Sequence, residues 1–194
     1  MAEQLYIKKI EDVIMKQIAK SEIPEDYVHS KDTVKWLLNI KPDADIALKI
    51  AALGHDIERS LGDKKVKRLD YKSYDEFKKA HSLNSAKIIA SIMKKFNTNQ
   101  ELIYDVCNLI ANHETGGDKR SDILKHADSI SFFNVNLPYY FERNTEEETR
   151  RRCIWGLERL PKALQKQVFD FEYDSKRLNS LMHSLRKKYK VDLS

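Results

Sequence analysis

The sequence predicts one all-α domain that spans residues 1–194 and folds as a compact bundle of helices. Three observations favour this fold class. Apolar residues recur at steps of three and four along most of the chain. There are no alternating runs of β-branched residues with hairpin turns between them. Hydrophobic residues make up 41% of the 194 positions, which is enough for one sizeable core.

The predicted helices of the first half are separated by residues that end or cap helices. These separators are Pro24, Pro42, Asp43 or Asp45, and Gly116-Gly117. The predicted helices cover residues 3–20, 28–40, a segment that includes 46–53, then 74–96 and 99–113. Residues 58–73 are charged, and we expect them to be irregular.

The second half contains three further predicted helices. The first carries Leu124 and Ala127 and reaches Asp128, and Pro138 predicts an aromatic turn over residues 137–141. Helices near 145–159 and 174–190 follow as packing elements. The last of them has an apolar stripe formed by Leu178, Leu181, Met182 and Leu185.

Composition and charge exclude several classes of protein. The net charge of +5 comes from interspersed basic and acidic residues, which does not favour nucleic-acid binding. No stretch approaches the roughly 20 apolar residues of a membrane span, and the first twenty residues lack a signal-peptide core. Cys107 and Cys153 lie in helical patterns that suggest neither a disulfide nor a thiolate metal site. We therefore expect a cytoplasmic protein. The sequence is also compatible with a homo-oligomer.

Six ionisable residues lie at core-facing positions, where burial is costly unless something pairs with them. They are His29, His55, Asp56, His81, His113 and Asp128. A divalent metal ion accepts both neutral imidazole and ionised carboxylate, so it explains such a set economically. The mixed nitrogen and oxygen ligands favour Mn, Fe, Co, Ni or Zn. One ion, or two ions about 3.5–4 Å apart that share an aspartate, would use this set.

A single histidine on an apolar stripe is more often a satisfied core or capping residue than a metal ligand. The two remaining histidines serve as internal comparisons. His126 lies two residues from Asp128 and therefore faces the far side of its helix, and His183 lies at the margin of its stripe. We predict that neither binds metal.

In its order of residues, the sequence resembles the HD-domain superfamily of metal-dependent phosphohydrolases. The resemblance covers about residues 25–135, with the region 140–194 left for helical packing. It rests on His29, on the doublet in Leu53-Gly54-His55-Asp56-Ile57, and on Asp128 in Ala127-Asp128-Ser129-Ile130. It implies that these residues bind a first metal ion. His81 and His113 stand where the two-metal members have two additional histidines.

The resemblance also implies roles around the metal ions. Asp56 and Asp128 would orient a metal-activated hydroxide, and Arg59 and Lys125 would bind the phosphate of the substrate. Protonation of the leaving group has no clear candidate, although Glu58, which replaces a small residue of the usual motif, and Glu114 are close in sequence to the predicted ligands. The loop with Lys64, Lys65, Lys67 and Arg68 is either a substrate rim or a solvated loop.

The sequence thus favours a phosphohydrolase, acting on a phosphomonoester or phosphodiester in a small, nucleotide-like substrate. Two alternatives remain. The same six ligands occur in di-iron oxygenases related to the HD fold. A non-catalytic domain could use a structural metal ion and bind a nucleotide or a protein partner through its C-terminal helices.

Overall fold

The computed structural model describes residues 2–189 and confirms the all-α class, with no β-strand in that range. The first helices are α1 (Ala2–Ile18), α2 (Asp26–Ile40), α3 (Ile46–Gly54), α4 (Tyr74–Lys95) and α5 (Gln100–Asn112). The others are α6 (Lys119–Ser131), α7 (Leu137–Arg143), α8 (Glu146–Glu158), α9 (Lys162–Phe169) and α10 (Lys176–Tyr189). Short 3-10 segments η1 (Ile57–Lys64) and η2 (Arg68–Asp70) precede α4, and a π-helical turn η3 (Phe132–Asn136) joins α6 to α7.

Side-chain caps explain where several helices begin. Asp45, and not Asp43, caps α3 by accepting a hydrogen bond from the backbone N–H of Leu48 at 2.9 Å. Asp118 accepts from two backbone N–H groups at the start of α6. Thr145 and Glu148 form a reciprocal capping box at the start of α8. These local signals set the start of each helix independently of its packing partners.

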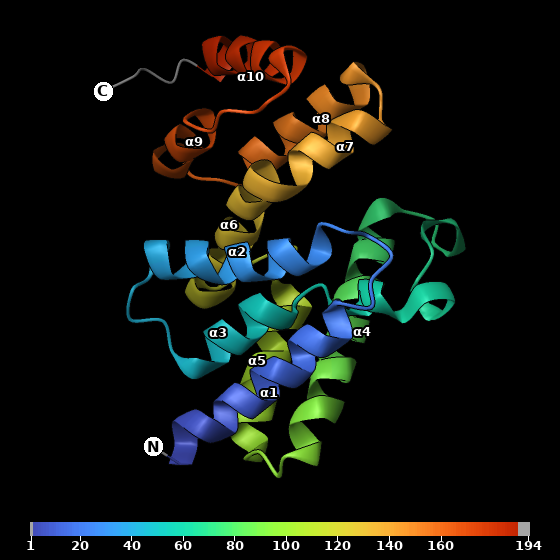
Figure 1. The fold of residues 1–194 in the computed structure, drawn as a ribbon, viewed down its shortest axis with the longest axis vertical. Coiled ribbons are helices and arrows are strands. Elements are labelled where there is room, and N and C mark those ends of the chain that lie inside the picture. Colours follow the sequence, from blue (N-terminus) through green and yellow to red (C-terminus); the bar gives the residue numbers. More distant parts are fainter. Residues whose placement is uncertain (1, 190–194) are drawn as a thin grey trace.

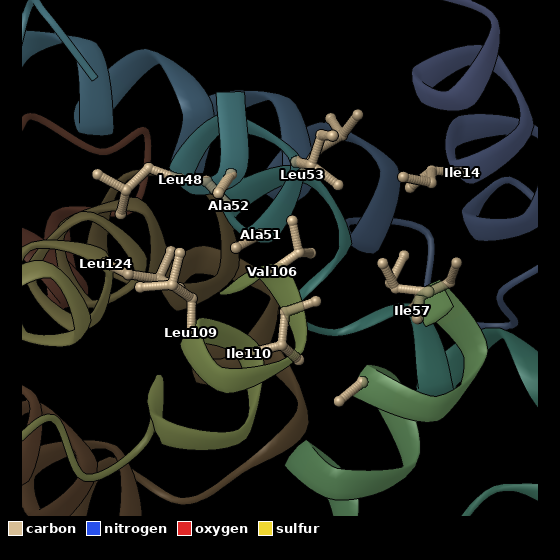
Figure 2. Packing of buried hydrophobic residues seen from close by; sticks show 14 of the residues in the cluster. Ile14, Leu48, Ala51, Ala52, Leu53, Ile57, Val106, Leu109, Ile110 and Leu124 are labelled. Atoms are coloured by element: carbon tan, nitrogen blue, oxygen red, sulfur yellow. The ribbon is translucent and has the colours of Figure 1, made fainter. Parts of the chain in front are cut away.

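The larger hydrophobic core forms around α3, the most completely buried helix. Figure 2 shows Leu48 and Ala51 of α3 beside Val106 and Leu109 of α5. Gly54 lets α3 approach α4 closely, since a Cβ there would lie 2.5 Å from Cδ1 of Ile89. This close packing brings the C-terminal end of α3 to the centre of the molecule.

A second hydrophobic cluster lies at the other end of the elongated molecule, where α7 to α10 stack (Figure 1). It includes Phe133, Cys153 and Leu181. Trp36 and Ile40 of α2 pack against both clusters, so α2 connects the two ends. The expectation that the last third packs through apolar stripes is consistent with this cluster.

Three details differ from the sequence expectations. Residues 137–141 are not a turn: they belong to α7, which tolerates Pro138 because the first turn of a helix needs no N–H there. Helix α9 was not predicted, because its eight residues carry a short apolar pattern. The charged segment 58–73 contains two 3-10 segments and is not wholly irregular.

No described helix combines the length and apolar character that a membrane span requires.

Candidate metal centre

The six predicted ligands converge from five different places in the chain. His29 lies on α2, His81 on α4 and Asp128 on α6, while His113 directly follows α5. His55 and Asp56 directly follow α3. All four imidazoles and Asp56 are buried, and the side chain of Asp128 is 17% exposed. The packing of α2, α4, α5 and α6 around α3 therefore brings these polar side chains into one interior cluster.

Asp56 lies at the centre of this cluster. Its Oδ1 is 2.8 Å from Nε2 of His81 and 3.9 Å from Nε2 of His113. Its Oδ2 is 3.7 Å from Nε2 of His55 and 3.9 Å from Nε2 of His29. One carboxylate thus faces all four imidazoles, two through each oxygen.

Asp128 faces one half of the cluster. Its Oδ1 lies 3.3 Å from Nε2 of His29 and 3.4 Å from Nε2 of His55. Its Oδ2 instead accepts a hydrogen bond from Arg159 at 3.1 Å. His29, His55 and Asp128 therefore form one group of three ligand atoms.

Each imidazole is held through Nδ1. His55 and His113 donate from Nδ1 to the carbonyl oxygens of Ala52 at 2.9 Å and Ile110 at 2.7 Å. His81 Nδ1 donates to Glu58 Oε2 at 2.7 Å. The other ring nitrogen, Nε2, is left to face the cluster. Such hydrogen bonds from the other ring nitrogen are typical of metal-binding histidines, since they fix the tautomer and the ring orientation.

His29 follows the same pattern through a hydroxyl group. The hydroxyl of Ser131 donates to the carbonyl oxygen of His29 at 3.2 Å, so its oxygen is free to accept from Nδ1 of His29 at 2.9 Å. All four histidines therefore present Nε2 to the interior.

The charges of the cluster stabilise one another. Burial alone would raise the pKa of Asp56, but Arg59 and His55 outweigh it and hold that pKa well below its usual range. The pKa of Asp128 is also well below its usual range, because His29 and His55 outweigh the effect of burial. Burial would lower the pKa of His55, yet Asp56 and Asp128 raise it to about 9. The two aspartates are therefore ionised at neutral pH, as metal ligands must be.

These residues fit divalent metal ions. Within residues 2–189, the buried Nε2 atoms of His55 and His113 have no hydrogen-bond partner, which is costly unless a further group binds them. Three groups have ligand atoms that all lie within 4.8 Å of one another. They are His29-His55-Asp128, His55-Asp56-His113 and His81-His113-Glu114. Among the described residues, neither His126 nor His183 belongs to any of these groups.

Three further residues were predicted to take part in catalysis or substrate binding, and only two of them contact the ligand cluster. Glu58 is buried and binds His81 Nδ1 and the backbone N–H of Val66. Arg59 donates to Asp56 Oδ2 at 3.0 Å and is 30% exposed, so it lies beside the cluster and reaches solvent. Lys125 instead pairs with Asp122 at 2.7 Å. Its role in phosphate binding stays a prediction that this contact does not support.

Glu114 is a more central residue than the sequence analysis recognised. Its Oε1 lies 3.4 Å from Nε2 of His113, and it pairs with Lys78 and Arg159. A signal for it was present, because His113-Glu114 follows α5 just as His55-Asp56 follows α3. In both doublets the histidine is the C-cap residue and binds the carbonyl three residues earlier.

Arg159 was not predicted at all. It lies at the end of α8, and its side chain is only 8% exposed. Its guanidinium donates to Asp128, Glu114 and Ser129, and it packs on the ring of Trp155 with 4.4 Å to the centroid. The C-terminal region therefore contributes directly to the wall of the site, although no sequence pattern indicated it.

The fold and this cluster define a class: an all-α domain whose core contains a group of imidazoles and carboxylates that can hold a metal ion. Residues 4–181 match a family described as "Domain of unknown function (DUF4202)", and the chain belongs to that family. No curated protein and no solved structure matches the chain.

Proposed function

We propose that this chain is a metal-dependent phosphohydrolase of the HD-domain type that acts on a small, nucleotide-like phosphate ester. The observation that carries the proposal is the convergence of four Nε2 atoms on Asp56, with those of His55 and His113 buried and without a hydrogen-bond partner among the described residues. Bound divalent ions of the Mn, Fe, Co, Ni or Zn type would lower the pKa of a coordinated water toward neutrality and neutralise phosphate oxygens.

The arrangement supports two adjacent ion positions that share Asp56. His29, His55 and Asp128 would hold one ion, and His81 and His113 the other, with Glu114 as an additional carboxylate. Because Asp56 faces both sets of histidines, it would be available as a ligand to either ion. Removing a histidine from one set should therefore reduce the metal content without emptying the whole site.

The remaining residues would bind the substrate and manage its protons. Arg59 reaches solvent beside Asp56 and can donate to a phosphate oxygen. Asp56 and Asp128 would orient the attacking oxygen. Glu58 binds Nδ1 of His81, so it acts through that histidine as a positioning residue. Burial would raise the pKa of Glu114, but Lys78 and His113 outweigh it and hold that pKa well below its usual range, so Glu114 would act as an ionised carboxylate ligand.

The test measures metal content and hydrolysis together. Protein purified without chelator is assayed by mass spectrometry and with a phosphomonoester and a phosphodiester of p-nitrophenol. We expect two transition-metal equivalents in the wild type, about one in His81→Ala with activity lost, and two in the control His126→Ala. His126 lies on α6 with Asp128 but outside the ligand groups, so it controls for loss of a histidine in itself.

The results that would overturn the proposal are specific. Protein that holds no metal and takes up no Mn, Co or Ni would refute the metal centre. Bound metal without turnover of either ester would leave a binding domain. Iron content with oxygen consumption would instead indicate an oxygenase.

A further inference from the structure

A basic cleft opens beside His81, between the segment that follows η1 and helix α8. It has a volume of about 320 Å³. Six cationic side chains line it: Arg59, Lys65, Lys67, Arg68, Lys78 and Arg152. The acidic residue in its wall, Glu58, is already engaged with His81 and with the backbone of Val66. Three of these cations, Arg59, Lys65 and Lys78, are paired with carboxylates. The other three add positive charge to a cleft that has direct access to one histidine of the candidate metal centre.

Arg152 is the most informative of these cations. Its guanidinium carbon lies 4.2 Å from the ring centroid of Trp155 and 4.4 Å from that of Phe132. It makes no ion pair within the part of the chain that the structure describes. The neighbouring arginines do pair: Arg150 with Glu146 and Arg151 with Glu147. Aromatic packing therefore holds Arg152 in place and leaves its hydrogen-bond donors available to an anion.

The opposite wall of the cleft carries more uncompensated charge. Lys67 is exposed and has no recorded ion pair among the described residues, and Arg68 binds only the carbonyl oxygen of Tyr71, which leaves its charge unneutralised. The hydrogen bond from the Val66 N–H to Glu58 ties this segment to the residue that holds His81. The cations on the segment are thereby kept next to the metal centre.

We propose that this cleft is a second phosphate-binding site, so that the substrate carries at least two phosphate groups. One phosphate would lie at the metal centre, and another would lie between Arg152 and the Lys67-Arg68 segment. This inference rests on the proposed function for the first phosphate. The second site itself rests on independent residues, since none of Lys67, Arg68 and Arg152 contacts the metal-ligand cluster.

The experiment compares binding of inorganic tripolyphosphate and of orthophosphate by calorimetry, with the full chain as purified and after removal of metal by a chelator. We expect tripolyphosphate to bind at least about 10-fold more tightly than orthophosphate in both forms, because several charge-assisted bonds act together. Arg152→Ala should weaken tripolyphosphate binding by about 10-fold or more. Arg151→Ala, one residue away on the exposed and paired side of α8, should leave it unchanged.

Lys67→Ala serves as a second variant. The Lys67 side chain makes no hydrogen bond or ion pair with the described residues, so the change should leave folding intact. We expect it to weaken tripolyphosphate binding severalfold, with an unaltered circular-dichroism spectrum. Equal affinity for the two anions, or equal behaviour of Arg152→Ala and Arg151→Ala in folded protein, would refute the second site. If Arg152→Ala does not fold, unchanged binding in Lys67→Ala would refute it.

The two proposals can fail separately. Tripolyphosphate binding that depends on Arg152, together with no hydrolysis of any ester at any added metal, would overturn the phosphohydrolase and leave the anion site standing. Hydrolysis of the p-nitrophenyl monoester with no preference for polyphosphates would do the reverse.

Discussion

Replacing Arg159 with methionine should destabilise the protein and do so most in the metal-free form. Methionine has a similar length but no charge, so the change removes the hydrogen bonds to Asp128 and Glu114 while much of the packing on Trp155 is retained. Both carboxylates are largely buried, with 17% and 7% of their side chains exposed. In the variant, both carboxylates would lose the positively charged guanidinium in a part of the protein that is poorly accessible to water.

The magnitude follows from what remains around each carboxylate. Breaking a buried ion pair by removing one partner costs about 3–5 kcal/mol. Glu114 keeps Lys78, and Asp128 keeps His29 and His55, so we expect the lower end, about 3 kcal/mol. For a chain of this length, that loss corresponds to a decrease in Tm of about 6–12 °C.

The assay is thermal unfolding followed by circular dichroism, with and without chelator. Arg151→Met is the matched control, because Arg151 is 64% exposed on the same helix and pairs only with Glu147, so its Tm should change by about 1–2 °C at most. Added Mn²⁺ should reduce the defect of Arg159→Met, since a metal ion supplies positive charge to Asp128. A Tm for Arg159→Met within about 2 °C of the wild type would show that the Arg159 contacts do not stabilise this site.

Three further outcomes follow from the same structure. The contribution of His55 to the stability of metal-free protein should be fully present below pH about 6.5 and be lost as pH rises through about 9, because the pKa of His55 is raised to about 9 on folding. Urea unfolding in chelator checks this, and an unchanged profile in His55→Gln would contradict it. Free metal at 100 times its Kd should raise Tm by about 5–11 °C per site, and equal Tm with and without chelator would argue against binding. Gly54→Ala should cost about 1–3 kcal/mol in urea, since its Cβ would meet Cδ1 of Ile89. Ile89→Val removes that carbon and should recover part of the loss; no recovery would exclude this contact as the cause.

The helices could be predicted where local chemistry is strong. Asp45 and Pro42 mark the boundary before α3, and apolar residues recur at helical spacing along α5. Prediction failed at α7, because Pro138 is compatible with either a turn or the first turn of a helix. Only the continuation of α6 through η3 decides between them.

The candidate ligands could be predicted for a similar reason. A histidine such as His29 or His81 on an apolar stripe is conspicuous in the sequence, because burying it requires a partner. The sequence also indicated that His126 faces away from Asp128 on the same helix. Such conclusions need only the helical period and the cost of burying charge.

The sequence by itself determined the all-α class, the helix boundary at Pro42 and a set of six candidate ligands. The tertiary structure alone decided how those ligands face one another, with Asp56 between two pairs of imidazoles. It also decided that Arg152 and Arg159 of the C-terminal region border the same site. The physical reason is that helical periodicity depends on neighbours three or four residues apart. The contact between Arg159 and Asp128 instead spans 31 residues and exists only because the tertiary fold brings the C-terminal end of α8 next to Asp128 of α6.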